Sequence, residues 1–260
     1  MNFITQVLNS SNVKMWHILS SCALALAVVV ITAPENTHAY SQTPVQQACL
    51  NGPLSTEGAK IVSAKGEECV LTGVNWFGFE TQSHVVHGLW TRGYDDMLAQ
   101  ISGLGFNVIR MPFSIEAIES EEITNIDFSA GRNADLAGST PLEAMELIID
   151  TAAEQGILVL LDLHSLKGDN HFHGLWYDDA YSEADFSSAW ETITKRFGEK
   201  PNVIGADLKN EPHGEATWGG VARRLTGALK LRELATRSIA TPPTGSLSSR
   251  GSKAGPRAAT

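Results

Sequence analysis

The chain has 260 residues, 43% of them hydrophobic, and a formal net charge of −10. This length suffices for one large domain such as an α/β barrel, or for two small ones. The acidic balance disfavours nucleic acid and anionic lipid as partners, because both are polyanions. A neutral polymer such as a polysaccharide is compatible with the charge, although the charge does not select it.

The first 39 residues have the pattern of a secretory signal peptide. Lys14 precedes an apolar run from Ile18 to Ile31, and Thr37-His38-Ala39 places small residues at the −3 and −1 positions of a cleavage site. A membrane anchor is the alternative, but the run is short for a span. We therefore expect a secreted protein, extracellular or periplasmic, with no membrane association after cleavage.

Cleavage there would leave two cysteines, Cys49 and Cys69. Disulfides form in oxidising compartments, so an exported chain with two cysteines is expected to join them. Two free thiols are the alternative.

The segment from Gly52 to Cys69 is short, polar and punctuated by glycine, which indicates a small hairpin at the bottom of a larger domain. A strand-like stretch follows at Leu71–Trp76. The next apolar residues recur at helical spacing and predict a helix on whose face lie Met97, Leu98, Ile101 and Leu104. A second strand, Val108–Met111, is expected to stop at Pro112.

Two further helices and two further strands follow. Thr140-Pro141-Leu142-Glu143 is a capping box with proline at the first helical position. The nearly continuous hydrophobic run Ile157–Leu163 predicts a parallel strand covered on both faces. Ser182 can cap a helix whose apolar residues are Phe186, Trp190, Ile193 and Phe197, and Val203–Leu208 is the fourth predicted strand.

Strands and helices therefore alternate, which is typical of a parallel α/β fold. Polar or aromatic residues end each strand, namely Asn75-Trp76, Arg110, Asp162 with His164, and Asn210-Glu211. All such ends lie at the active-site face of a barrel. A doubly wound sheet would use one switch point, and no Gly-x-Gly-x-x-Gly turn follows the first strand. We predict the amino-terminal half of a (β/α)8 TIM barrel over residues 40–218.

Residues 219–260 have a different composition. They contain eight Lys and Arg, one acidic residue (Glu233) and no aromatic residue. Such a segment buries too little apolar surface to order itself, so we expect a disordered basic tail. A genuine basic extension is the alternative; we favour a frameshifted reading frame, because the tail stands where a barrel would continue.

Four motifs carry a resemblance to a known family. They are Gly73–Glu80, Asn107–Pro112, Leu161–His164 and Asn210-Glu211-Pro212, in this order and each at a predicted strand end. Through them, the chain resembles glycoside hydrolase family 5, particularly the bacterial endo-β-1,4-glucanases, over about residues 71–218. The resemblance implies a retaining hydrolase of β-1,4-glucan that uses no cofactor; mannanase and xylanase are neighbouring possibilities.

Retaining hydrolysis explains the residue types. One carboxyl protonates the leaving oxygen while a second attacks the anomeric carbon. By resemblance, Glu211 is the acid/base, Asn210 binds the sugar 2-hydroxyl, Arg110 braces the nucleophile and His164 binds substrate. The structural alternatives are a surface glutamate, a turn asparagine, an ion pair of Arg110 with Asp162 or Glu211, and a hydrogen-bonded core histidine.

Aromatic side chains could form the walls of a sugar cleft, because sugar rings stack on aromatic faces. The candidates are Trp76, Trp90, Trp176 and Tyr177, of which we select Trp176. A metal site built from Asp162, His164, His171 and His173 is the alternative chemistry. We expect none, because the sequence offers no closed ligand set.

The family nucleophile is a glutamate at the end of a seventh strand, whereas this chain shows four. Glu215 and Glu233 do not occupy such a position. We therefore expect the chain as written to be inactive. A non-catalytic glucan-binding remnant and a non-functional product of a disrupted gene are the competing hypotheses.

Overall fold

The computed structural model describes residues 48–50, 53–169 and 173–217. They fall within one of the two units into which the chain divides, Ala39–Thr260. The predicted signal peptide, the residues after 217 and His171 lie outside the described residues. Among those described, no helix has the length and apolar character needed to cross a membrane.

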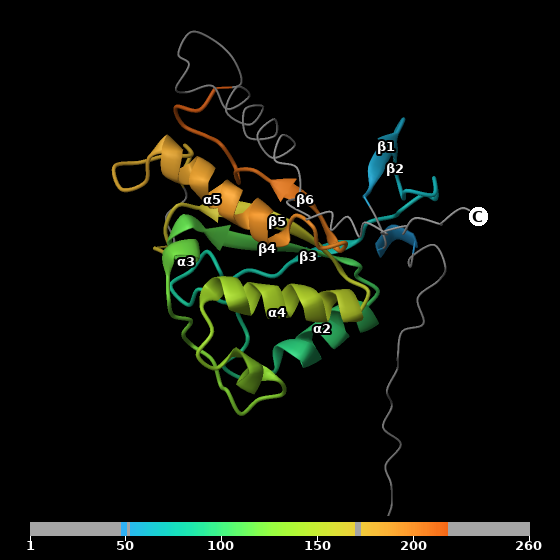
Figure 1. Ribbon diagram of the computed structural model, residues 1–260, viewed down its shortest axis with the longest axis horizontal. Coiled ribbons are helices and arrows are strands. Elements are labelled where there is room, and N and C mark those ends of the chain that lie inside the picture. The colour runs from blue at the N-terminus through green and yellow to red at the C-terminus, as the bar shows by residue number, and fades with distance from the viewer. Residues whose placement is uncertain (1–47, 51–52, 170–172, 218–260) are drawn as a thin grey trace, which may run out of the picture. The chain divides into compact units, whose positions relative to one another are not determined.

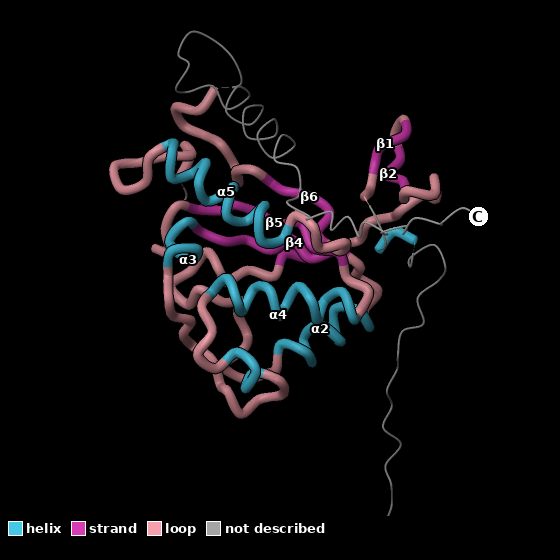
Figure 2. Tube along the Cα trace, viewed as in Figure 1, coloured by secondary structure: helices cyan, strands magenta, loops and turns pink. Residues whose placement is uncertain are grey.

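A parallel sheet of four strands forms the centre of the fold. The strands are β3 (Gly73–Asn75), β4 (Val108–Ser114), β5 (Leu158–Ser165) and β6 (Val203–Asp207), and each pairs with the next in chain order. Figure 2 shows them as adjacent magenta segments. A sheet wound in one direction without reversal is the arrangement of a (β/α) barrel, so the predicted α/β fold class is confirmed.

Helices connect these strands. They are α2 (Tyr94–Gly103), α3 (Ile115–Glu119), the short 3₁₀ helix η1 (Asn133–Leu136), α4 (Pro141–Glu154) and α5 (Glu183–Phe197). Figure 1 shows the three long helices in chain order beside the sheet. Both predicted helix starts are confirmed, because Thr140 and Ser182 each accept a backbone hydrogen bond and complete a capping box.

The main hydrophobic core lies between these helices and one face of the sheet. Side chains alternate between the two faces of a strand, so every second residue of β4 and β5 points toward the helices. These positions are nearly inaccessible: Ile109, Met111, Phe113, Val159, Leu161 and Leu163 are at most 3% exposed. The predicted α5 face is buried with them, including Trp190, whose indole packs edge-on against Phe113 at 5.5 Å.

The hairpin predicted before the first barrel strand is present. Strands β1 (Ser55–Glu57) and β2 (Lys60–Val62) pair antiparallel, and Cys49 is joined to Cys69 by a disulfide, the pairing expected from the sequence. Leu50 packs against Val108 and Leu158, the first residues of β4 and β5. This segment therefore covers the amino-terminal ends of the barrel strands.

The prediction that Pro112 ends the second barrel strand is wrong. Strand β4 continues through Pro112 to Ser114. In a parallel strand, successive residues direct their backbone groups to alternate sides. The Arg110 carbonyl accepts from the Trp76 amide on the β3 side, so Pro112 faces that side too. Because β3 ends at Asn75, the missing N–H of Pro112 interrupts no ladder bond.

Candidate active site

The sheet face opposite the helices carries a polar cluster. Strand register places Asn75 beside Arg110 and Asp162 beside Asp207, all on this face. Arg110 is the third residue of β4 and does not end the strand, contrary to the sequence-based expectation. Its long side chain nevertheless reaches the groups at the carboxyl ends of β5 and β6.

Arg110 is the centre of the cluster. Its guanidinium lies 3.0 Å from Asp162 Oδ2 and donates to Asp207 Oδ2 at 2.7 Å. It also donates to the side-chain oxygens of Asn75 (3.3 Å) and Asn210 (3.0 Å). The five fixed N–H groups of arginine suit this convergence of acceptors. The ion pair with Asp162, one of the alternatives from sequence, is thus present.

A directional hydrogen-bond chain connects Asp162 to the loop after β6. Nδ1 of His164 lies 2.7 Å from Asp162 Oδ2, and its Nε2 lies 3.3 Å from the amide nitrogen of Asn210. A carboxylate accepts and an amide nitrogen donates, so the partners place the imidazole proton on Nδ1. The Asn210 oxygen is then directed toward Arg110. This chain fixes the orientations of His164 and Asn210.

Glu211 follows Asn210 in the loop after β6. It is exposed, and its backbone has a φ of +41°, the left-handed region that non-glycine residues rarely adopt. The Asn210 amide donates to the Leu163 carbonyl at 3.1 Å, which keeps this loop beside the end of β5. The sequence-predicted residues Arg110, His164, Asn210 and Glu211 are therefore brought together at one end of the sheet.

Burial changes the acidity of two carboxyls near this cluster. Asp162 is completely inaccessible, and burial raises its pKa against the opposing effects of His164 and Arg110. Its Oδ1 has no hydrogen-bond partner, and the contacts of Oδ2 with Arg110 and His164 do not fully offset the effect of burial. Burial also raises the pKa of Glu80, whose Oε2 accepts from the Gly78 amide at 2.7 Å.

Trp176 does not line a cleft, and that prediction is wrong. Its side chain is 2% exposed and belongs to the hydrophobic core, so neither face is available to a sugar ring. Trp76 is likewise buried and donates its indole N–H to the His87 carbonyl at 2.9 Å, and Tyr177 is partly buried against the core. Trp90, by contrast, is 48% exposed and is the accessible candidate.

Sequence reasoning missed Asp207 and Lys209. Asp207 accepts two bonds from Arg110, which is 97 residues away in the chain. Lys209 is 5% exposed, although lysine is almost never buried. No local pattern marks either residue, because their partners are distant in sequence. The one usable signal was their position at a predicted strand end, where barrel enzymes place functional groups.

Within the described residues, no group of three His, Cys, Asp or Glu side chains is placed to hold a metal ion. His173 lies 3.5 Å from Asp178, whereas Asp162 and His164 bind Arg110 and Asn210. His164 and His173 are therefore used in separate interactions.

A singly wound parallel sheet with charged groups toward its carboxyl ends defines the class of α/β-barrel enzymes. The family model described as cellulase (glycosyl hydrolase family 5) matches residues 62–241. The chain therefore belongs to glycoside hydrolase family 5. This match runs past residue 218, so the family likeness extends further along the chain than the boundary drawn from composition.

Relatives of this chain include two bacterial endoglucanases. An endoglucanase of Paenibacillus polymyxa is 42% identical over 183 residues, which are 69% of this chain and 45% of that protein. The major extracellular endoglucanase of Xanthomonas campestris pv. campestris is 37% identical, over 79% of this chain and 39% of that protein. The chain thus spans less than half the length of these relatives.

Solved structures agree in fold. An endocellulase from Pyrococcus horikoshii is 42% identical with a TM-score of 0.67, covering 73% of this chain and 55% of that one. The catalytic domain of the major Xanthomonas campestris endoglucanase is 38% identical with a TM-score of 0.67, covering 72% and 54%. The four described barrel strands are half of an eight-stranded barrel, which agrees with the 55% and 54% of these two chains that the match covers.

Proposed function

We propose that this chain supplies the acid/base half of a retaining β-1,4-glucan hydrolase, with Glu211 as the proton donor. The observation that carries the proposal is the Arg110-centred cluster, because it fixes Asn210 directly before Glu211. A fixed Asn210 amide can bind a sugar 2-hydroxyl, an interaction that strengthens toward the transition state. Glu211 would protonate the leaving oxygen and then deprotonate the incoming water.

The reaction also needs a nucleophile. By family resemblance this is a glutamate at the end of a seventh strand, and the described residues provide four parallel strands. The second carboxylate therefore lies outside them. Without it the covalent glycosyl intermediate cannot form, so we expect a rate loss on the order of 10⁴-fold or more in the chain as written.

A turnover assay on carboxymethyl-cellulose tests this proposal. The purified 260-residue chain and Glu211→Gln should both release no measurable reducing sugar. Clear turnover that Glu211→Gln abolishes would confirm the acid/base role and refute the expected inactivity. Turnover that survives in Glu211→Gln would contradict the role of Glu211. Parallel assays on mannan and xylan distinguish the substrates open to this family; the endoglucanase relatives favour cellulose.

Glucan binding without cleavage is a second candidate function, favoured by exposed aromatic residues after β3. Phe77 and Trp90 are 50% and 48% exposed, and His87 packs edge-on between them, at ring distances of 4.6 and 5.3 Å. Such faces suit stacking of sugar rings. Trp90→Ala should reduce retention on insoluble cellulose. Phe128 is exposed to a similar extent (43%), and Phe128→Ala should leave retention unchanged. Equal retention of the wild type, Trp90→Ala and Phe128→Ala would contradict this function.

Secretion is proposed on three grounds. The apolar run from Ile18 to Ile31 fits a signal peptide, the Cys49–Cys69 disulfide fits an oxidising compartment, and one relative is described as extracellular. Cleavage after Ala39 predicts a mature protein that starts at Tyr40. Amino-terminal sequencing of the exported protein checks this, and recovery of the uncleaved chain in membranes would favour an anchor.

A further inference from the structure

The backbone of Glu211 is strained in a way that its own sequence does not explain. A left-handed φ of +41° brings the Cβ of a non-glycine residue close to the following carbonyl oxygen. Asparagine and aspartate tolerate this region through local hydrogen bonds, but glutamate has no such preference. Conformations of this kind persist only where the surrounding structure holds them, and they concentrate at functional sites.

Two side chains bind the carbonyl oxygens on either side of the Glu211 Cα. The Lys209 ammonium donates to the Asn210 carbonyl at 2.7 Å, and Nδ1 of His213 lies 2.7 Å from the Glu211 carbonyl. These carbonyls belong to the peptide groups whose orientations define φ and ψ of Glu211. Both have left the β ladder, which ends at Asp207, so side chains take the place of strand partners.

Each of these two residues is itself bonded to a segment outside its own loop, Lys209 to β5 and His213 to the loop that follows β5. Lys209 is buried and also reaches the His164 carbonyl at 3.4 Å, which ties it to β5. The His213 amide donates to the Gly174 carbonyl at 3.1 Å. A Cβ on Gly174 would stand 2.5 Å from the His213 oxygen, so the two segments are in contact. The two side chains that donate to these carbonyls are therefore held by groups outside the Glu211 loop.

From this geometry we infer that Lys209 and His213 are positioning residues that clamp the Glu211 backbone in its left-handed conformation and so direct its carboxyl. The inference rests on the proposed acid/base role of Glu211 for its catalytic meaning. The clamp itself is a property of the backbone and can be observed without turnover.

The charges around Lys209 favour this role. The residues that face it are Asp162 on β5, Asp207 on β6 and Glu211, and each raises its pKa. Burial has the larger effect and lowers the pKa of Lys209 to about 8. Near neutral pH the ammonium therefore donates charge-assisted hydrogen bonds, which are stronger than neutral ones. Above pH 8 the bond to the Asn210 carbonyl should weaken as the ammonium loses its proton.

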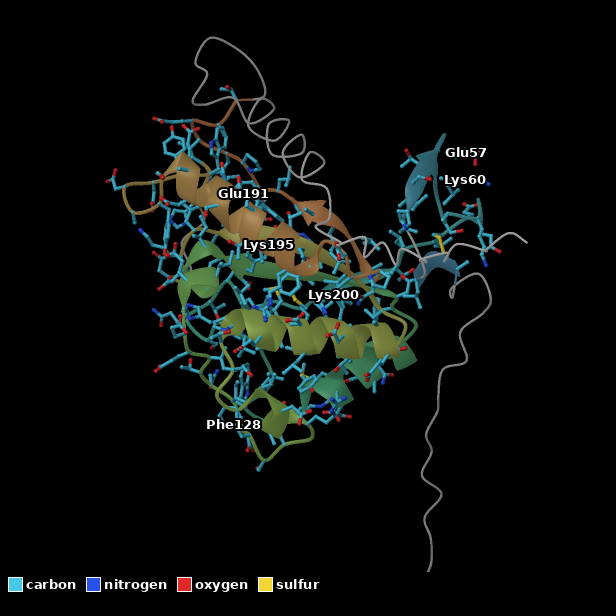
Figure 3. All side chains as sticks on the ribbon, viewed as in Figure 1. Glu57, Lys60, Phe128, Glu191, Lys195 and Lys200 are labelled. Atoms are coloured by element: carbon cyan, nitrogen blue, oxygen red, sulfur yellow. A yellow bond between two sulfur atoms is a disulfide. The ribbon has the colours of Figure 1, made fainter. Side chains whose placement is uncertain are left out.

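Nuclear magnetic resonance of the labelled full chain tests the clamp directly. A strong intraresidue Hα–HN contact marks positive φ at Glu211 in the wild type. Lys209→Met and His213→Phe should each weaken that contact, and Lys209→Arg, which keeps a donor, should restore much of it. The control is Lys195→Met, because Lys195 is an exposed lysine on α5 (Figure 3) and the charge change is the same. Retention of positive φ in either folded clamp variant would overturn the inference.

Two further readouts separate the clamp from folding and from the proposed function. Should Lys209→Met fail to fold, the wild type still decides: the Glu211 amide resonance should shift with a midpoint near pH 8, and a flat titration overturns the inference. Where the wild type hydrolyses carboxymethyl-cellulose, both clamp variants should lose kcat on the order of 10²-fold with little change in KM. Turnover that survives in Glu211→Gln, together with positive φ at Glu211 in the wild type, refutes the proposed function alone.

Discussion

Replacement of Arg110 by methionine should destabilise the protein by an amount that depends on pH. The variant leaves Asp162 buried without its cation, and removal of one partner of a buried ion pair costs roughly 3–5 kcal/mol. Asp162 can limit this cost by taking up a proton. For a carboxyl whose ordinary pKa is 3.8, that uptake costs about 4 kcal/mol at pH 7 and about 2 kcal/mol at pH 5.

The direction follows from proton linkage. In Arg110→Met the folded state binds a proton at Asp162 that the unfolded state does not bind above pH 4 or so, so unfolding releases it. The stability of the variant relative to wild type therefore falls as pH rises from 5 to 7, by up to about 2.7 kcal/mol, because each of the two pH units contributes about 1.36 kcal/mol.

Urea unfolding followed by tryptophan fluorescence measures this difference at both pH values. Arg92→Met is the matched control, because Arg92 pairs with Asp96 on the surface of α2 with both side chains over a third exposed. Such a pair contributes about 0.3–0.5 kcal/mol, so the control should change little at either pH. An equal loss of unfolding free energy in Arg110→Met at pH 5 and pH 7 would refute the reasoning, because it would show that proton uptake by Asp162 does not limit the cost.

Three other expectations can be checked with single variants or with the wild type. Cys49→Ser with Cys69→Ser should lower the free energy of unfolding by about 3 kcal/mol in urea, since the disulfide spans 20 residues; an unchanged midpoint would contradict this. Asn133→Ala should cost at least about 3 kcal/mol, because the oxygen of the buried amide accepts from the Tyr94 N–H and its two N–H groups are shared among three backbone carbonyls; thermal unfolding measures it, and a loss under about 1 kcal/mol would refute it. Nitrogen-15 spectra of neutral His164 should show the proton on Nδ1, and Nε2 protonation would contradict the hydrogen-bond chain from Asp162.

The sequence predicted the repeating architecture well, because strands and helices leave local signals. The capping boxes at Thr140 and Ser182 are contained within four residues each, and both helices begin where expected. The second barrel strand was harder. Proline usually interrupts a strand, and only the early end of the neighbouring strand β3 explains why Pro112 is accommodated.

The Asn-Glu-Pro motif of the candidate site was predictable from sequence, whereas the side chains that hold its backbone were not. Asn210-Glu211-Pro212 is recognisable by itself, whereas Lys209 resembles any other charged loop residue until its contacts with distant backbone are known. The prediction that Trp176 lines a cleft failed for a related reason. An aromatic residue in a loop can turn toward substrate or toward the core, and the choice depends on packing partners that are not adjacent in the chain.

The disulfide-linked hairpin gives the molecule a place that can be altered at little functional cost. It packs on the amino-terminal ends of β4 and β5 through Leu50, whereas the polar cluster gathers toward their carboxyl ends. Glu57 and Lys60, which flank its exposed turn (Figure 3), make no contact with that cluster among the interactions described. A fluorophore or a surface tether attached there would report on or immobilise the protein without touching the polar cluster at the opposite end.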